Sequence, residues 1–287
     1  MSNLRNPYDR FDEQLQRAFE QNLLAALLED VGSGDLTGQL IPEDLRVKAR
    51  VIVREDAVLC GAPWFEGIML AVDHHTSVEW QYAEGDMMAA DSVVCVIEGS
   101  ARSLFTAERA ALNFLQLLSG VATSTRKFVD AIAGTKARIL DTRKTVPGLR
   151  QAQKYAVRVG GGDNQRMALF DGILIKENHI GAAGGVAKAF HAALALNAGV
   201  PIQIEVESLA QLEEALGAGA TSVLLDNFDT DMMREAVRVN AGRALLEASG
   251  GVNLHSVRAI AETGVDRISI GSLTKDVRAV DYSLRIM

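Results

Sequence analysis

Short apolar strands alternate with helical stretches through the second half of this 287-residue chain. The strand-like segments are ARILDT (137–142), DGILIKEN (171–178), PIQIEVES (201–208), SVLLDN (222–227), ALLEASGG (244–251) and DRISIGS (266–272). Helical sequences such as LAQLEEALGAGA (209–220) separate them. Parallel strands need a long crossover between them, and a helix is the usual solution. The alternation therefore restricts the second half to a parallel α/β fold.

Three carboxylates recur at a constant interval within this pattern. Glu205, Asp226 and Glu247 each follow an apolar strand core and lie 21 residues apart (226 − 205 and 247 − 226). Equal βα units would place them at the same end of a barrel, whose C-terminal rim is where catalytic groups gather. An open doubly wound sheet would also contain such units, but no GxGxxG motif follows the first strand. We therefore expect a barrel, with Glu247 supporting the site rather than contacting substrate.

The first half of the chain follows a different pattern. Residues 11–30 have the apolar spacing of an amphipathic helix, and three Val- and Ile-rich segments then predict an antiparallel sheet: VKARVIVRED (47–56), TSVEWQYAEG (76–85) and SVVCVIEGSA (92–101). A helix is expected to begin at Thr106 as N-cap, and a second helix to follow Gly120. We place the boundary between two domains near Gly120.

The overall composition excludes several classes of protein. The chain has 29 Lys and Arg against 37 Asp and Glu, a net charge of −8, which disfavours a nucleic-acid surface. No run of about 18 apolar residues could span a membrane, and the first residues lack the apolar core of a signal peptide. With Cys60 and Cys95 as the two cysteines, reduced and partly buried thiols are expected. These features predict a globular cytoplasmic protein.

Basic residues gather where the predicted strands end, against the acidic average of the chain. Arg143 and Lys144 follow the strand ARILDT directly, and Arg166 and Lys176 lie beside the next strand. Arginine offers a planar fork to a carboxylate or phosphate, and lysine a compact charge. The four cations therefore predict a site for a ligand with several anionic groups.

Two further groups of residues lie at the same predicted rim. Glu205 and Asp226 suit sugar hydroxyls or Mg²⁺. Small residues follow the last two strands, namely Ser249, Gly250, Gly251, Gly271 and Ser272. A bare backbone at such loops approaches phosphate oxygens closely. A phosphorylated ribose with a further anionic group would meet all of these requirements.

Each of these features also has a plainer interpretation. The glycines after strands can be turn residues, Glu205 or Asp226 can pair with a neighbouring lysine, and Arg143 with Lys144 can be a solvated pair. Residues 160–162 (GGG) can be a helix end followed by a turn. His179 can make a structural hydrogen bond or act in a site.

Motifs in order along nearly the whole chain resemble those of the quinolinate phosphoribosyltransferases, the decarboxylating nicotinate-nucleotide pyrophosphorylases. The motifs are EDVGSGDLT, FTAERAALNFLQLLSGVAT, ARILDTRKTVPGLR, YAVRVGGGDNQR, LIKENHI, IEVE, LLDN, EASGGV and ISIGSLT. Each alone is a weak signal, but together they are highly specific.

The resemblance implies a two-part α/β fold. Residues 1–119 would form an N-terminal open α/β sandwich, joined by a C-terminal helix over 275–287. Residues 120–274 would form an incomplete TIM-like α/β barrel of about seven strands. The resemblance also implies a homodimer, in which Arg109 completes the partner's site.

The implied reaction joins quinolinate to phosphoribosyl pyrophosphate with Mg²⁺, and gives nicotinate mononucleotide, pyrophosphate and CO₂ for de novo NAD biosynthesis. Two alternatives remain open. A related phosphoribosyltransferase would act on another pyridine-like substrate, and a non-catalytic barrel would only bind a phosphosugar. The complete set of cations argues against the first, and the cations together with the acid pair argue against the second.

The resemblance also implies roles for individual residues. The cations expected to face the two carboxylates of quinolinate are Arg109, Arg143, Arg166 and Lys176. Lys144 would hold pyrophosphate or the charge of the substrate, as a catalytic residue. Glu205 and Asp226 would be catalytic as well, contacting the ribose hydroxyls and Mg²⁺ through water. The 5′-phosphate would be bound by Ser249, Gly250, Gly251, Gly271 and Ser272.

Two substrate-binding positions depart from the commonest pattern of the family. Gln165 and Lys275 each stand where a histidine is frequent. Glutamine keeps hydrogen bonding but does not titrate near neutrality, which puts in doubt any acid–base role of position 165. Lys275 would strengthen phosphate binding.

Overall fold

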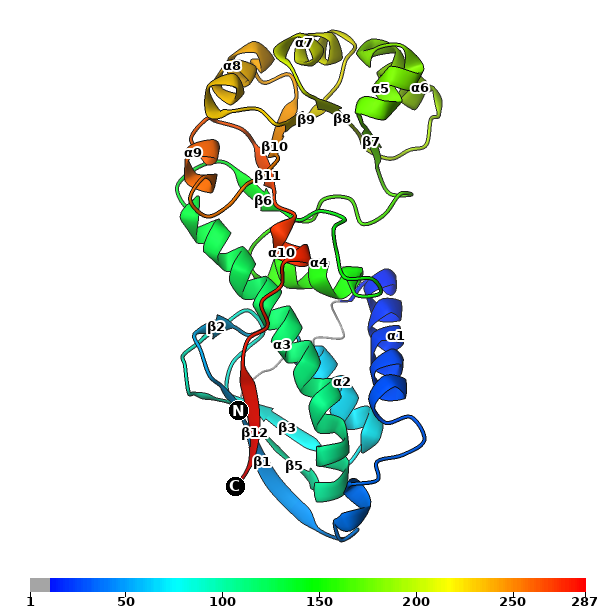
Figure 1. Cartoon of the computed structure of the whole chain (residues 1–287), viewed down its shortest axis with the longest axis vertical. Helices are drawn as coiled ribbons and strands as arrows, with labels where there is room; N and C mark the ends of the chain where they lie inside the picture. Colours follow the sequence, from blue (N-terminus) through cyan, green and yellow to red (C-terminus); the bar gives the residue numbers. More distant parts are fainter. Residues whose placement is uncertain (1–10) are drawn as a thin grey trace. The chain divides into compact units, whose positions relative to one another are not determined.

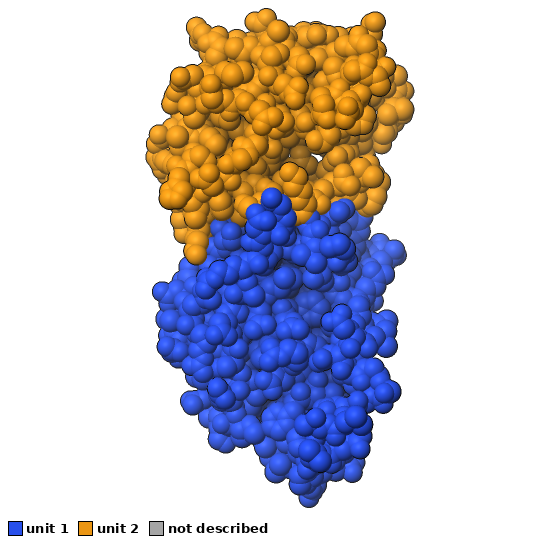
Figure 2. Space-filling view, viewed as in Figure 1, with its two compact units in different colours: residues 1–126, 145–161, 274–287 blue, residues 127–144, 162–273 orange. Residues whose placement is uncertain are grey.

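The computed structural model of this protein describes residues 11–287, which form two compact units (Figures 1 and 2). Unit 1 consists of residues up to Arg126, Thr145–Gly161 and Thr274–Met287. Unit 2 consists of Lys127–Lys144 and Gly162–Leu273. The chain therefore enters unit 1 three times. Within residues 11–287, no helix is both long enough and apolar enough to cross a bilayer.

Unit 1 contains a four-stranded antiparallel sheet with the strand order β12-β1-β5-β3. Its strands are β1 (Arg46–Val53), β3 (Ser77–Trp80), β5 (Val93–Ser100) and β12 (Tyr282–Ile286). A smaller pair joins β2 (Ala57–Val58) to β4 (Met87–Met88). Ala49, Val51 and Val53 of β1 are fully buried, as the period of two in a half-buried strand requires. The three antiparallel strands expected from the sequence are thus confirmed.

The helices of unit 1 bury aromatic and aliphatic side chains. They include α1 (Glu13–Asp30), α2 (Ala62–Val72) and α4 (Arg150–Val159), with a short 3₁₀ helix η2 (Gly38–Leu40). Asp12 caps α1 by accepting a hydrogen bond from Leu15 N, and Trp64 of α2 is fully buried beside the rings of Phe19 and Tyr155. Cys60 and Cys95 are buried free thiols, as expected.

Helix α3 (Ala101–Ala131) corrects two expectations about the middle of the chain. It begins five residues before Thr106 (106 − 101), whose hydroxyl bonds to Arg102 O and Asp35 instead of capping a helix. It also continues through Gly120, because this glycine leaves room for the backbone of Arg278 in place of a side chain. Gly120 allows close packing inside the helix, whereas in the sequence pattern it resembled a helix break.

The expected C-terminal helix over 275–287 is wrong. Helix α10 (Ser272–Lys275) is short, and the chain then forms strand β12, which pairs with β1 from Ala49↔Ile286 to Val53↔Tyr282. Tyr282 and Leu284 are buried while Arg285 is exposed. Such alternation has the period of a strand and not of a helix.

Unit 2 is built on a six-stranded parallel sheet with the order β6-β11-β10-β9-β8-β7. Its strands are β6 (Arg138–Leu140), β7 (Ile173–Ile175), β8 (Ile202–Val206), β9 (Ser222–Asp226), β10 (Leu245–Ser249) and β11 (Arg267–Ser269). All six predicted strands are confirmed. β6 and β7 follow each other in the chain but lie at opposite edges, so the barrel is incomplete. The described residues contain six strands of this sheet where about seven were implied.

Helices cover the outer face of this curved sheet (Figure 1). They are α5 (Glu177–Ala183), α6 (Val186–Ala195), α7 (Leu209–Gly217), α8 (Thr230–Asn240) and α9 (Val257–Ala261). Ser208 and Asp229 cap α7 and α8 with side-chain oxygens, which is why these helices begin there. In β8, Ile204 and Val206 are buried on one face, and Gln203 and Glu205 lie on the other.

Strand register corrects the inference from equal spacing. Glu205 of β8 and Glu247 of β10 both pair with Leu224 of β9, whereas Asp226 pairs with Ser249. Asp226 therefore lies two residues closer to the C-terminal end of the sheet than the two glutamates (226 − 224). The connections between these strands differ in length, so equal spacing of the three carboxylates in the sequence does not place them at equal positions along the sheet.

Candidate active site

Arg143 lies close enough to Arg166 for its positive charge to act on the Arg166 guanidinium. Burial lowers the pKa of the Arg166 guanidinium, the positive charge of Arg143 lowers it further, and Asp171 opposes both effects. Arg166 Nη1 donates to Gly172 O at 2.8 Å. Arg143 Nε is buried without a hydrogen-bond partner among residues 11–287. Two neighbouring cations with unused donor capacity favour an anionic ligand.

Asp141 brings these two arginines together, a role that sequence reasoning missed. Its carboxylate is fully buried and accepts hydrogen bonds from Gln165 N at 2.9 Å and Asn164 Nδ2 at 2.6 Å. The segment that carries Arg143 is thereby tied to the segment that carries Arg166. The available signal was an acidic residue between a buried strand end and two cations.

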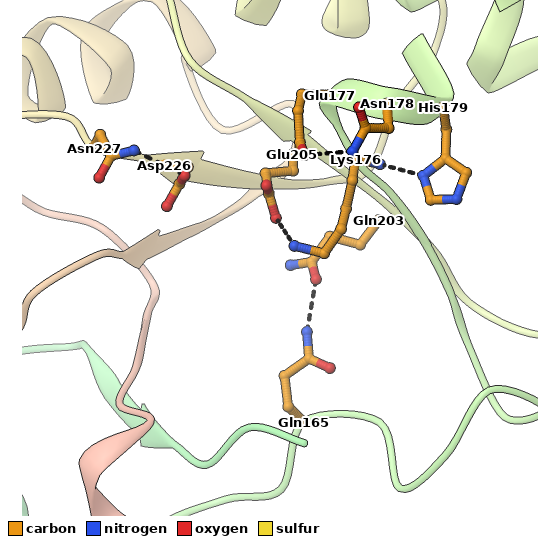
Figure 3. A network of polar contacts seen from close by, with 9 residues as sticks. All are labelled: Gln165, Lys176, Glu177, Asn178, His179, Gln203, Glu205, Asp226 and Asn227. Atoms are coloured by element: carbon orange, nitrogen blue, oxygen red, sulfur yellow. Dashed lines mark hydrogen bonds and ion pairs between the residues drawn. The ribbon is translucent and has the colours of Figure 1, made fainter. Parts of the chain in front are cut away.

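Lys176 and Glu205 form an ion pair at the C-terminal ends of β7 and β8 (Figure 3). Lys176 Nζ donates to Glu205 Oε2 at 2.9 Å, so the plainer interpretation of Glu205 as a lysine partner is observed. Burial raises the pKa of Glu205, Lys176 lowers it, and the charges of Asp226 and Glu177 raise it. The side chain of Lys176 remains 46% exposed, whereas that of Glu205 is 9% exposed. The lysine can therefore contact a ligand without leaving the glutamate.

Hydrogen bonds from neighbouring side chains fix the orientation of this acid and base group. His179 Nδ1 accepts from Lys176 N at 3.0 Å at the start of α5, which is the structural hydrogen bond considered for this histidine. Asp226 Oδ2 accepts from Asn227 Nδ2 at 2.9 Å instead of pairing with a lysine. Asn227 has a left-handed backbone with φ of +58° and was not identified from the sequence. Figure 3 shows Asp226 and Glu205 on neighbouring strands.

The small residues after β10 and β11 form open, backbone-lined turns. Gly250 and Gly251 have φ of +103° and +60°, a conformation that favours glycine. A Cβ added at Gly271 would lie 3.2 Å from Lys144 Cδ, so the Lys144 side chain passes over this glycine. Exposed backbone beside an exposed lysine suits a phosphate group.

The remaining predicted residues have separate positions. Gln165 bonds through its amide to Gln203, and Gly160–Gly162 include the C-cap of α4 and a turn, as the plainer interpretation proposed. Arg109 is an exposed residue of α3, and Lys275 ends α10 beside Asp276. Both belong to unit 1.

The acid pair can supply part of a metal site. Within residues 11–287, no three His, Cys, Asp or Glu side chains are grouped to hold a metal ion. Glu205 and Asp226 are near enough for the charge of one to raise the pKa of the other. One or two carboxylates fit Mg²⁺ that keeps water and substrate phosphates as its other ligands.

Known proteins similar to this chain share both of its parts. The family model described as the N-terminal domain of quinolinate phosphoribosyl transferase matches residues 35–119, and the C-terminal domain model matches residues 121–285. A probable nicotinate-nucleotide pyrophosphorylase [carboxylating] of Bacillus subtilis is 39% identical and covers 90% of each chain. The Mycobacterium leprae nicotinate-nucleotide pyrophosphorylase [carboxylating] is 40% identical, covering 93% of this chain and 96% of its own.

A solved structure extends this likeness to three dimensions. The nicotinate-nucleotide pyrophosphorylase of Francisella tularensis has a TM-score of 0.91 and 43% identity, and covers 94% of this chain and 96% of its own. Together with the two matched domain models, this shows that the chain belongs to the quinolinate phosphoribosyltransferase family.

Proposed function

We propose that this protein transfers the phosphoribosyl group of phosphoribosyl pyrophosphate to quinolinate, with loss of CO₂. The products are nicotinate mononucleotide and pyrophosphate, a step of NAD biosynthesis. Relatives that match nearly the whole chain carry names for this reaction, as nicotinate-nucleotide pyrophosphorylase or as quinolinate phosphoribosyltransferase [decarboxylating]. The observation that carries the proposal is that one unit holds both a pair of neighbouring guanidiniums and an acidic pair, because the substrates bring two carboxylates and a phosphorylated ribose.

The cations bind and orient quinolinate in this proposal. Arg143 and Arg166 face its carboxylates, and the bound dianion offsets the positive charge of Arg143 that lowers the pKa of Arg166. Lys176 adds a third positive charge. It follows β7, at the edge of the sheet opposite β6, the strand that Arg143 follows. A bound pyridine ring held at both carboxylates presents its nitrogen to the ribose in one orientation, which lowers the entropic barrier.

The acid pair, Glu205 and Asp226, acts on the ribose in this proposal. As pyrophosphate leaves the anomeric carbon, positive charge develops on the ribose ring, and Glu205 and Asp226 stabilise it. The ring nitrogen forms the new bond and becomes positively charged. When the adjacent carboxylate leaves as CO₂, the electron pair of the broken bond stays on the ring carbon, where the neighbouring positive nitrogen stabilises it until the carbon takes a proton. No covalent intermediate with the protein is needed.

The phosphates of the second substrate fit the backbone-lined turns. Ser249, Gly250 and Gly251 after β10, with Gly271 and Ser272 after β11, bind the 5′-phosphate. Lys144 is placed over Gly271 to hold pyrophosphate or the charge of the substrate, and Lys275 adds a charge for phosphate. Mg²⁺, when bound, neutralises the pyrophosphate, and Glu205 with Asp226 would hold it through water.

The active protein is a homodimer in this proposal, and it acts in the cytoplasm. Arg109 is an exposed cation of unit 1 and completes the quinolinate site of the partner. The full set of cations that read quinolinate is then Arg109, Arg143, Arg166 and Lys176.

The direct test is to incubate the purified protein with quinolinate, phosphoribosyl pyrophosphate and Mg²⁺, and to measure nicotinate mononucleotide and CO₂. We expect both products in equal amounts, and no product when EDTA removes the metal. Nicotinate in place of quinolinate should give little product, because it lacks the second carboxylate. Efficient use of nicotinate would contradict the proposal.

A further inference from the structure

A chain of hydrogen bonds runs from the interior of unit 2 to the backbone of Arg166. Gln203 Nε2 donates to Glu247 Oε2 at 2.9 Å, and Gln165 Nε2 donates to Gln203 Oε1 at 2.7 Å. Arg166 N then donates to Gln165 Oε1 at 2.7 Å. Figure 3 shows the two glutamine side chains end to end. Three side chains on separate segments thus form one directed row.

The direction of this row depends on its first member. A carboxylate oxygen only accepts hydrogen bonds, so Gln203 must turn its NH₂ group towards Glu247 and its oxygen towards Gln165. Gln165 must then turn its own NH₂ towards Gln203, which leaves its oxygen free to accept from Arg166 N. We infer that Glu247 is a positioning residue, which fixes both amide orientations and thereby holds the backbone of Arg166.

Burial shows that Glu247 is not placed for stability alone. Its exposure is 1%, and Oε1 is buried without a hydrogen-bond partner among the described residues. An unpaired buried carboxylate oxygen costs stability, whereas a neutral side chain of similar shape would avoid much of that cost. Gln203 is also buried, and it lines a cavity of about 370 Å³ together with Gln165, Arg166 and Glu247.

The consequence for the reaction is confined to one substrate. Arg166 stands beside Arg143 in the proposed quinolinate site, and Asp141 holds Gln165 N from the other side. If the Gln165 amide turns over, Arg166 N faces an NH₂ group and loses its acceptor. This step rests on the proposed function, because it assumes that Arg166 binds quinolinate. The phosphate turns after β10 and β11 are not part of the row.

The first test is Glu247→Gln, which keeps the shape but permits both amide orientations. We expect the KM for quinolinate to rise by about 10- to 100-fold, since small misplacements of binding groups have effects of this size. The KM for phosphoribosyl pyrophosphate should stay within about twofold, and Tm should be equal or higher. Glu262→Gln, which removes an exposed pair with Arg258 in the same unit, is the control with no change in either KM.

The second test exchanges the carboxylate and the amide between positions 247 and 203. Gln203→Glu alone puts two acceptors against each other and should also raise the KM for quinolinate. The double variant Gln203→Glu with Glu247→Gln restores the order, because Gln at position 247 donates to Glu at position 203, which still accepts from Gln165. Recovery of the quinolinate KM to within about threefold of wild type is expected.

Three outcomes would overturn the inference. They are an unchanged quinolinate KM in Glu247→Gln, an equal rise in both KM values with a fall in Tm, and a double variant no better than Gln203→Glu. If the wild-type protein makes no nicotinate mononucleotide, the proposed function fails instead. A crystal structure of Glu247→Gln still decides the inference in that case, because Arg166 N either keeps Gln165 Oε1 as its acceptor or loses it.

Discussion

The ion pair of Lys176 with Glu205 gives the pH dependence of the site a specific origin. Its ammonium group lowers the pKa of Glu205, which burial and the charges of Asp226 and Glu177 raise. Glu205 stabilises a developing cation only when it is ionised, so activity should fall as the pH drops towards this raised pKa. The pH at which activity is lost on the acid side is therefore set by charges that can be changed one at a time.

Two substitutions should move this acid limb in opposite directions. Lys176→Met removes the group that lowers the Glu205 pKa, so the limb of log(kcat/KM) against pH should shift to higher pH. Glu177→Gln removes a charge that raises the same pKa, so the limb should shift to lower pH. The position of the limb is the measurement, since the Lys176 variant also loses activity overall. Shifts in the same direction would contradict Glu205 as the titrating group.

Arg143→Ala should lower kcat/KM for quinolinate by about 100-fold or more, because the half-buried site loses a charge-assisted hydrogen-bond donor to a carboxylate. Far-ultraviolet circular dichroism and Tm should stay close to wild type, since Arg143 Nε makes no hydrogen bond that the fold would lose. Arg234→Ala is the matched control, because it removes an exposed arginine of α8 in the same unit. An unchanged kcat/KM in Arg143→Ala would contradict the site assignment.

The identities of the charged residues were predictable from the sequence, but their partners were not. Arg143, Lys176, Glu205 and Asp226 stand at or just after the ends of apolar strands, and Arg166 lies in the loop that precedes β7. A local sequence pattern carries no information about how one segment packs against another. It therefore did not reveal that Asp141 holds the loop of Arg166, or that Lys176 turns to Glu205.

Single elements show the same division between local and distant causes. The six parallel strands were predicted because each is an apolar run followed by turn residues, a local property. Helix α3 and strand β12 were mispredicted because their causes lie elsewhere in the chain. Gly120 lies inside the helix because the backbone of Arg278 packs against it. Residues 282–286 form a strand because they pair with the edge strand β1.

Gly120→Ala tests this explanation at the level of α3. Alanine is ordinarily better than glycine inside a helix by about 1 kcal/mol, yet here its Cβ would collide with the backbone of residue 278. We expect the free energy of unfolding to fall by about 1–3 kcal/mol, as overpacking usually does. Gly217→Ala in α7 is the control, since a Cβ there meets nothing within 4 Å, and it should leave Tm equal or higher.

Gly271→Ala tests the turn after β11. The added Cβ would lie 3.2 Å from Lys144 Cδ and 3.7 Å from Thr142 Oγ1, so the lysine must move. We expect the KM for phosphoribosyl pyrophosphate to rise by about 10-fold, or about 1.4 kcal/mol, with little change in Tm. Gly217→Ala again serves as the control. A change confined to the quinolinate KM would contradict the placement of phosphate at this turn.

At the scale of the whole molecule, the proposed dimer draws the residues of one reaction from two chains. Arg109→Ala and Arg143→Ala should each be inactive alone. After the two variants are mixed and allowed to exchange subunits, half of the dimers contain one chain of each kind. In such a dimer one site has both substitutions and the other has neither, so about a quarter of wild-type activity should return. No recovery despite demonstrated subunit exchange would contradict the contribution of Arg109 to the partner.

The position of β12 also has a consequence for the order in which this protein forms. β12 follows all the other strands of its sheet in the sequence, and it pairs with β1 on the side away from β5. Until residues 282–286 have left the ribosome, β1 is an uncovered edge strand of the growing polypeptide, and such edges pair readily with other chains. Unit 2 is complete at Leu273 and can fold earlier, although it begins later in the sequence. For this protein, synthesis from the N-terminus thus finishes the second unit before the first.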